Sequence, residues 1–377
     1  MSASLRRVVI LGSTGSVGRQ ALEVIDRHRD RLKVVGLVAG SDSATLKDQA
    51  ERFGVARTGL GAEAAEELAR AEEADVVLNA VVGAAGLKAS VAALESGKTL
   101  ALANKETLVA GGSACAAAAA RGGGRIVPVD SEHAAIAQCL RGATSGQVRS
   151  ITLTASGGPF RTRADMTGVT PEDALAHPTW SMGPKITIDC ATVMNKGLEA
   201  IEAHHLFGLP FERIHIVVHP QSVVHGIVEL TDGSLLMHAA APDMKLPIQT
   251  ALLGDLEAAE AYGSLDLVGR GALEFEELDR DRFPAVELAY AAGRRGGTYP
   301  AVLNAANEVA VTAFLDHRLG FLDIASVVED VLEAHEGGEA QDQSDVAIVL
   351  EADRWARERA ERSVDARSVS VAAGGRA

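Results

Sequence analysis

The feature that most constrains the fold is an apolar strand that leads through a glycine-rich turn into an amphipathic helix. The strand is expected over Leu5–Leu11, and the turn, GSTGSVG, occupies Gly12–Gly18. Glycine lets a backbone approach a pyrophosphate closely, and the following helix supplies amide donors and positive potential. The spacing is G-x-x-G-x-x-G, which alone is a weak signal. Its place after the first strand favours a nicotinamide dinucleotide site over a plain turn.

Four further strands, separated by helical stretches, extend this pattern. They are expected over Leu32–Ala39, Ala74–Val82, Lys98–Ala103 and Arg125–Val129. Strands that alternate with helices predict βαβ units, a parallel sheet and right-handed crossovers. Residues 1–149 are therefore expected to form a Rossmann-like α/β domain.

The pattern changes after about Gly146. Shorter strands are expected at residues 148–155, 214–219, 223–230 and 234–240, with a hairpin turn at Thr231–Gly233. They predict a mostly antiparallel sheet in an α+β domain over residues 150–255. An acidic linker at 256–282 precedes helices at 284–295, 300–317, 321–333 and 346–360. These helices predict a four-helix bundle over residues 283–363, followed by a flexible tail at 364–377.

Composition excludes several classes of function. The 36 basic against 51 acidic residues give a net charge of −15, which disfavours nucleic acid and anionic membranes as partners. Aromatic residues make up only 3%, too few for base-stacking platforms. Three scattered cysteines offer neither a disulfide framework nor zinc spacing, which indicates a reducing compartment, the cytoplasm. No apolar run approaches membrane-spanning length.

The stretch from His177 to Glu199 carries the densest set of reactive side chains. It is expected to form a mobile flap, a short extended run and the start of a ligand-holding helix. Lys196 and Glu199 lie three apart on that helix, where a surface ion pair is one interpretation. The flap before them favours a second interpretation, in which Asn195 and Lys196 face an anion and Glu199 faces a metal.

Two further acids follow the fifth strand. If the segment is extended, Asp130 and Glu132 point the same way and can share a hard divalent cation. Acids at a helix N-terminus would give the same pattern, and the motif alone does not decide between the two.

Polar groups also follow other strands. Asn104, Lys105 and Glu106 come just after the fourth, at the edge where parallel sheets bind ligands, although an ordinary helix start is the rival interpretation. After the second strand, Ser41 would suit a 2′-phosphate and Asp42 a free ribose hydroxyl, which leaves NAD or NADP open.

Two remaining motifs are less specific. SGGPF at Ser156–Phe160 offers amides to a phosphate or forms a structural turn. His219 and His225 are interpreted as structural or interfacial, because their strand geometry does not suit metal binding.

Taken in order along the chain, these motifs resemble the 1-deoxy-D-xylulose 5-phosphate reductoisomerase family. The resemblance runs from about Val8 to Glu333 and rests on GSTGSVG, LANKE, DSEH, SGGPF, HPTWSMG, MNKGLE, HPQSVVHG, PDMKLPI and LNAANEVAVTAFL. The family converts 1-deoxy-D-xylulose 5-phosphate to 2-C-methyl-D-erythritol 4-phosphate in non-mevalonate isoprenoid precursor biosynthesis. It uses NADPH and Mg²⁺ or Mn²⁺, with Co²⁺ as a further option, and acts as a homodimer.

The resemblance implies a role for each candidate residue. It makes the central domain catalytic and dimerising, with a lid that includes Trp180 and Met182. Lys105 and Glu132 would be catalytic. The NADPH site would comprise Thr14, Gly15, Ser16, Val17, Gly40, Ser41, Asp42, Ala80, Asn104, Lys105 and Glu106. Metal ligands would be Asp130, Glu132 and Glu199. The sugar phosphate would contact Lys105, Ser131, Glu132, Ser156, His177, Trp180, Cys190, Asn195, Lys196 and Glu199.

The sequence departs from the family at two positions. Cys190 stands where relatives often have a serine that contacts the phosphate, and a thiol is a poorer donor. Ser41 and Asp42 replace the more basic or amide residues that often follow the glycine corresponding to Gly40. Two other functions are kept as alternatives: a simple NAD(P)-dependent dehydrogenase or semialdehyde reductase, which would need no metal, and a non-catalytic NADPH-binding sensor.

Overall fold

The computed structural model describes residues 5–180, 182–254, 262–337 and 344–374, with the side chains of 145 and 368–374 left aside. The chain divides into two compact units. Unit 1 comprises Met1–Leu108, Gly112–Arg149 and His225–Gly271, and unit 2 comprises Val109–Gly111, Ser150–Val224 and Ala272–Ala377. Each unit is described by itself.

Unit 1 is built on a six-stranded parallel sheet. Its order is β3-β2-β1-β4-β5-β6, and all its described pairings are parallel. This is the strand order of dinucleotide-binding folds, with the switch point between β1 and β4. The strands are β1 (Arg6–Leu11), β2 (Leu32–Ala39), β3 (Thr58–Leu60), β4 (Val76–Asn79), β5 (Thr99–Leu102) and β6 (Arg125–Pro128). The predicted parallel α/β sheet is confirmed; β3, only three residues long, was not anticipated.

Helices connect these strands. They are α1 (Ser16–Arg27), α2 (Ser43–Phe53), α3 (Gly61–Ala69), α4 (Leu87–Glu95), α5 (Lys105–Gly122) and α6 (Ser131–Leu140). The strong amphipathic pattern of α1 buries Leu22, Val24 and Ile25 against the sheet.

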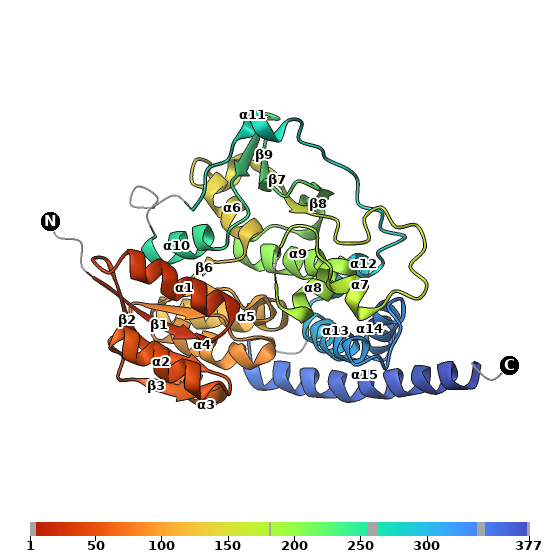
Figure 1. Ribbon diagram of the computed structural model, residues 1–377, viewed down its shortest axis with the longest axis horizontal. Coiled ribbons are helices and arrows are strands. Elements are labelled where there is room, and N and C mark those ends of the chain that lie inside the picture. The colour runs from red at the N-terminus through yellow and green to blue at the C-terminus, as the bar shows by residue number, and fades with distance from the viewer. Residues whose placement is uncertain (1–4, 181, 255–261, 338–343, 375–377) are drawn as a thin grey trace. The chain divides into compact units, whose positions relative to one another are not determined.

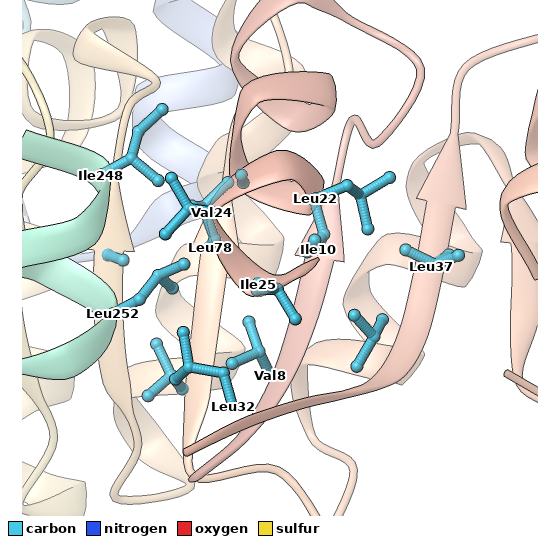
Figure 2. Packing of buried hydrophobic residues seen from close by; sticks show 14 of the residues in the cluster. Val8, Ile10, Leu22, Val24, Ile25, Leu32, Leu37, Leu78, Ile248 and Leu252 are labelled. Carbon is cyan, nitrogen blue, oxygen red and sulfur yellow. The ribbon is translucent and has the colours of Figure 1, made fainter. Parts of the chain in front are cut away.

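The core of unit 1 includes a helix from much later in the chain. In Figure 2, Ile248 and Leu252 of α10 (Lys245–Leu253) lie beside α1 and the strands. His28, just after α1, also hydrogen-bonds Gln249 through Nε2 at 2.6 Å, and both residues are buried. Residues 245–253 were expected to belong to the α+β domain, yet their side chains complete the core beside α1.

A second sheet contains β7 (Val148–Ala155), β8 (Ile214–Val218), β9 (Val224–Leu230) and β10 (Leu235–Ala239). The amide of Leu230 donates to the carbonyl of Ser234 at 2.9 Å, which closes the expected hairpin between β9 and β10. β7 and β8, however, pair in parallel, with Ile151 opposite Ile214. The long connection between them, which contains several helices, permits this direction; a mostly antiparallel sheet did not anticipate it.

The helices of unit 2 follow the predicted positions closely at its C-terminal end. They are α12 (Ala285–Arg295), α13 (Tyr299–Leu315), α14 (Asp323–Glu333) and α15 (Val346–Gly374). In Figure 1, α13 and α14 pack against α15. α15 continues to Gly374, so residues 364–374 are helical rather than an irregular tail. The expected division into domains remains a prediction.

The central helices of unit 2 are α7 (Pro171–Leu175), α8 (Pro184–Ala191) and α9 (Met194–Phe207). Here the expectation of a short extended run after the flap was wrong, because those residues form α8. Ile186, Thr187 and Ile188 favour strands by their branching, but Pro184 at the first turn suits a helix start. Within the residues that the structure describes, no helix combines the length and apolarity needed to cross a membrane.

Candidate functional site

The glycine turn is tightly packed at the switch point of the sheet. Gly12 has φ +83°, and a Cβ there would lie 2.6 Å from the carbonyl oxygen of Ala80. A Cβ on Gly18 would lie 2.2 Å from the Gly12 oxygen. Gly15 is the N-cap of α1 and provides no side-chain cap. The start of α1 therefore has no capping side chain of its own, and a helix N-terminus of this kind suits a pyrophosphate.

The end of β2 clarifies the role of Asp42. Gly40, Ser41 and Asp42 are all exposed. Asp42 is the N-cap of α2, and its Oδ1 accepts from the amide of Thr45 at 3.0 Å. Hydrogen bonds from the side chain and then the backbone of Thr45 lower the Asp42 pKa. The carboxylate therefore caps a helix, which weakens the interpretation that it is reserved for a ribose hydroxyl.

Two buried asparagines organise the loops after β4 and β5. Asn104 caps α5 by accepting from the amide of Thr107 at 2.8 Å and donates to the carbonyl of Gly83 at 2.9 Å. Asn79 donates to Ser90 Oγ at 2.8 Å and to the carbonyl of Gly86 at 3.0 Å. Ala80 lies between these anchored points. Sequence reasoning missed Asn79, although a polar residue ending the apolar strand VVLN was the available signal.

The acidic pair lies at the start of α6 and not in an extended segment. Asp130 is the N-cap, and Glu132 is in the first turn. One carboxylate oxygen of each lies within 4.8 Å of the other. The extended geometry was therefore wrong, because Asp and Ser favour the start of a helix, yet the helix start also brings the two acids together. This oxygen donor pair is suited to Mg²⁺ or Mn²⁺.

Lys105 and His133 hold Asp130 from two sides. Lys105 Nζ is 3.1 Å from Asp130 Oδ2, and the Lys105 side chain is only 7% exposed. His133, fully buried, places Nδ1 3.0 Å from Asp130 Oδ1. Ser131, between the acids, donates to Glu132 Oε2. The candidate catalytic lysine thus lies beside the acids, as the two motifs suggested, while Glu106 is buried at the start of α5.

Unit 2 contains a small pocket between the end of β7 and the start of α9. We call it the β7–α9 pocket; it is lined by Ala155, Ser156, Gly157, Gly158, Cys190, Val193, Asn195 and Lys196. Gly157 and Gly158 have φ of +85° and +66°, and a Cβ on Gly158 would lie 2.5 Å from the carbonyl oxygen of Cys190. The structure thus brings together four predicted phosphate contacts: Ser156, Cys190, Asn195 and Lys196.

His177 joins this pocket to the flap. Its Nδ1 accepts from the amides of Thr179 and Trp180, at 3.2 and 2.9 Å, so the neutral ring carries its hydrogen on Nε2. Nε2 lies 3.1 Å from Ser156 Oγ, which also accepts from the amide of Gly158 at 3.2 Å. The Ser156 hydroxyl hydrogen then remains available to donate to an anion. Burial, and to a smaller extent the charge of Lys196, lowers the His177 pKa.

The start of α9 presents a buried polar triad and not a surface ion pair. Glu199 accepts from Asn195 Nδ2 at 2.6 Å and from Lys196 Nζ at 2.7 Å, and all three residues are buried. Val193 has φ +60°, a left-handed conformation that a β-branched residue rarely adopts. Such a conformation makes the sharp turn between α8 and α9. Asp130 and Glu132 belong to unit 1, whereas Glu199 belongs to unit 2. That Glu199 is a metal ligand together with the two acids of unit 1 therefore stays a prediction.

The remaining candidates are quickly placed. Trp180 and Met182 are half-buried in the flap, while Ser181 lies outside the described residues. His219 Nδ1 is 2.7 Å from the Glu274 carbonyl, and His225 Nε2 is 3.2 Å from the Ala240 carbonyl. These backbone partners agree with the structural interpretation of both histidines.

A Rossmann-type sheet with a glycine cradle at its switch point, beside a lysine and two acids, is the arrangement of a nicotinamide-nucleotide-dependent enzyme. Family models for 1-deoxy-D-xylulose 5-phosphate reductoisomerase match residues 8–58 and 54–112, and models for its C-terminal domains match residues 126–207 and 239–359. The chain belongs to the 1-deoxy-D-xylulose 5-phosphate reductoisomerase family.

Individual relatives agree over nearly the full length. The enzyme of this name from Leifsonia xyli subsp. xyli is 54% identical, with 95% of this chain and 99% of the relative covered. The Zymomonas mobilis enzyme in complex with NADPH is 43% identical with a TM-score of 0.87, covering 96% of this chain and 99% of its own. A reductoisomerase in complex with NADPH, fosmidomycin and magnesium gives a TM-score of 0.91 at 37% identity, covering 96% and 98%.

Proposed function

We propose that this chain catalyses the NADPH- and metal-dependent rearrangement and reduction of 1-deoxy-D-xylulose 5-phosphate to 2-C-methyl-D-erythritol 4-phosphate, a step of non-mevalonate isoprenoid precursor biosynthesis. The observation that carries the proposal is the β7–α9 pocket, whose lining combines Ser156, Asn195 and Lys196 with two left-handed glycines. A simple dehydrogenase needs no such anion pocket in addition to its cofactor cradle. A cofactor sensor needs neither the pocket nor the acids beside Lys105.

NADPH would lie along the carboxyl edge of the unit 1 sheet. The amides of Ser16 and Val17, with Thr14 and Gly15 before them in the turn, would bind the pyrophosphate. Gly40, Ser41 and Asp42 would lie by the adenosine ribose, where the α2 N-terminus favours negative charge. Ala80, Asn104, Lys105 and Glu106 would line the remaining path. The tight packing of Gly12 and Gly18 supports this assignment, because it holds the turn closely against the start of α1.

Asp130 and Glu132 would hold Mg²⁺ or Mn²⁺, and we propose Glu199 as their third ligand. The bound metal would supply Lewis acidity at the substrate's ketone and neighbouring hydroxyl. Lys105, 3.1 Å from Asp130, is suited to donating a proton or hydrogen bond to a substrate oxygen, and Glu132 to assisting proton movement. Ser131 would contact the sugar backbone.

The phosphate of the substrate would occupy the β7–α9 pocket. Ser156 supplies its hydroxyl hydrogen, Lys196 its charge, and Asn195 its amide. His177 contacts both Ser156 and the backbone amide of Trp180. Phosphate binding at Ser156 would therefore affect the position of the flap that carries Trp180 and Met182. Binding energy at this remote group can then orient the reacting carbons and exclude water.

The direct test follows NADPH oxidation with 1-deoxy-D-xylulose 5-phosphate, with and without Mg²⁺ or Mn²⁺. Turnover that requires the sugar phosphate and stops with a chelator is expected. Reduction of a semialdehyde in the presence of chelator would instead support the dehydrogenase alternative. Cofactor binding without any turnover would support the sensor.

Glu199→Gln tests the proposed metal ligand. The amide keeps the size of the side chain but removes the anionic oxygen, so metal-dependent turnover should fall by about a hundredfold or more. Binding of NADPH, measured by its fluorescence, should stay near the wild-type value. Wild-type rates in Glu199→Gln would contradict the assignment.

We further propose that the chain acts as a homodimer in the cytoplasm. β10 is an edge strand of the second sheet, and its Leu235 and Met237 are 53% and 46% exposed. Apolar side chains on an open edge favour a second copy as partner. The three cysteines are free, as a reducing compartment would leave them. Sedimentation of the wild-type protein against Leu235→Lys tests the surface, with a shift to monomer as the expected result.

A further inference from the structure

A buried carboxylate on α8 has no part in the site described so far. Asp189 is 0% exposed and forms an ion pair with Lys185 at 2.8 Å through Oδ2. Its Oδ1 accepts from Asn307 Nδ2 at 2.8 Å. Asn307 is also fully buried, in the middle of α13. A buried carboxylate is costly unless its oxygens are paired. Lys185 is on α8 itself, so it is the bond from Asn307 on α13 that restricts where α8 can lie.

α8 depends on such contacts for its helical form. It has only eight residues, and its N-cap, Gly183, provides no side-chain cap. Helices this short are unstable alone, and the β-branched run at Ile186–Ile188 disfavours a helix further. The cross-helix bond from Asn307 therefore fixes a helix that its own sequence only weakly specifies.

The position of α8 determines one wall of the β7–α9 pocket. Cys190 follows Asp189 directly, and its carbonyl oxygen lies where a Cβ on Gly158 would come within 2.5 Å. The left-handed Val193 then leads at once into α9 and its Asn195 and Lys196. Movement of α8 would move the Gly158 wall and the first turn of α9 together.

We propose that Asn307 and Asp189 are positioning residues, whose hydrogen bond between α13 and α8 sets the geometry of the β7–α9 pocket and thereby its affinity for a phosphate group. This inference rests on the proposed function in taking the occupant of the pocket to be phosphate. It assigns a role to the LNAANEVAV segment, whose residues are not among those that line the pocket.

α13 offers a matched control for a merely structural role. Asn304 lies one turn earlier, is equally buried, and donates to Glu308 on its own helix at 2.9 Å. Replacing Asn304 by Leu removes a buried amide of the same helix whose hydrogen bond to Glu308 stays within α13. Asn307→Leu makes the same chemical change and removes the bond to Asp189.

The experiment measures binding of inorganic phosphate by calorimetry, NADPH binding by fluorescence, and the unfolding temperature of each variant. Asn307→Leu should weaken phosphate binding by up to about tenfold, because the lost hydrogen bond to the Asp189 carboxylate bounds the free energy that holds α8 in the binding geometry. NADPH binding should stay unchanged. Asn304→Leu should lower the unfolding temperature but leave phosphate binding unchanged. The double exchange Asp189→Asn with Asn307→Asp should recover phosphate binding, because an amide and a carboxylate again face each other.

Three results would overturn the inference: equal weakening by Asn304→Leu, unchanged binding in Asn307→Leu, or a wild-type protein that does not bind phosphate. Should Asn307→Leu not fold, Asn307→Ala removes the same donor with less bulk and gives the same readout. Phosphate binding is measured without turnover, so loss of the reductoisomerase assignment would appear separately, as a wild-type protein that binds phosphate but does not convert the sugar.

Discussion

At the scale of single residues, the site is defined by what each polar atom is already bonded to. His177 illustrates this, because its two ring nitrogens serve different partners. Nδ1 must stay unprotonated to accept from the flap amides. Burial helps by lowering the His177 pKa below its ordinary value of about 6.5.

This arrangement predicts a pH-dependent flap. The pKa of His177 is lower in the folded protein than in the unfolded chain. The neutral ring therefore contributes to the free energy of unfolding above about pH 6.5, and this contribution is lost as the pH falls through the lowered pKa. Protonated Nδ1 would face two N–H groups, and the flap backbone should rearrange. Trp180 fluorescence, in a Trp355→Phe background, should titrate with a midpoint below 6.5.

His177→Asn is the matching variant. Its carboxamide oxygen can accept from the same amides as in an Asx turn, and it does not titrate. The fluorescence change should therefore vanish. Persistence of the change in His177→Asn would show that another group controls the flap. The Trp355→Phe background is needed because the ring centroids of Trp355 and His335 lie 5.0 Å apart. Protonation of His335 could otherwise change the Trp355 fluorescence and obscure the signal of Trp180.

Cys190 gives a second prediction at this scale. Its side chain belongs to the lining of the β7–α9 pocket, where a hydroxyl would donate better than a thiol. Cys190→Ser should lower the KM for the sugar phosphate, by up to about tenfold if one bond to a charged group is gained. Cys139→Ser, on α6 and outside the pocket, serves as the control. An unchanged KM in Cys190→Ser would place the side chain away from the phosphate.

At the scale of elements, the glycine turn couples α1 rigidly to β1. A Cβ on Gly18 would lie 2.2 Å from the Gly12 oxygen and 2.6 Å from Ser13 Cα, both backbone atoms. Gly18→Ala must therefore displace the start of α1, and the NADPH dissociation constant should rise by tenfold or more, roughly the effect of losing one or two charge-assisted bonds. Gly146→Ala, where a Cβ meets no atom within 4 Å, should bind NADPH normally. Equal binding by both variants would contradict the cradle.

Elements with a clear period were predictable from sequence, and elements held by distant partners were not. β2 and β7 have the expected bounds, since runs such as LKVVGLVA leave little choice. α8 was taken for an extended run, because its branched residues favour a strand and the partner that holds it, Asn307, lies far along the chain. The acids of α6 were expected in an extended segment, with a helix start as the rival; the structure shows the helix start, and their metal-binding role stays a prediction.

At the scale of the whole molecule, the motif order indicated the family, and the relatives confirm it. Sequence alone did not predict that each unit is assembled from segments that lie far apart along the chain. The core beneath the cofactor helix takes Ile248 and Leu252 from a segment expected to belong elsewhere. The apolar periodicity of a helix is the same whichever sheet the helix packs against. The periodicity of α10 therefore could not predict which sheet it covers.

The distant origin of α10 also bears on synthesis of the protein. The strands and glycine turn of unit 1 leave the ribosome early, but the helix that seals Val8, Val24 and Ile25 ends only at Leu253 of a chain of 377 residues. Domains usually complete their folding in the order of translation. Unit 1 therefore keeps part of its apolar surface open until α10 is made, by which time the residues that line the β7–α9 pocket have also been made.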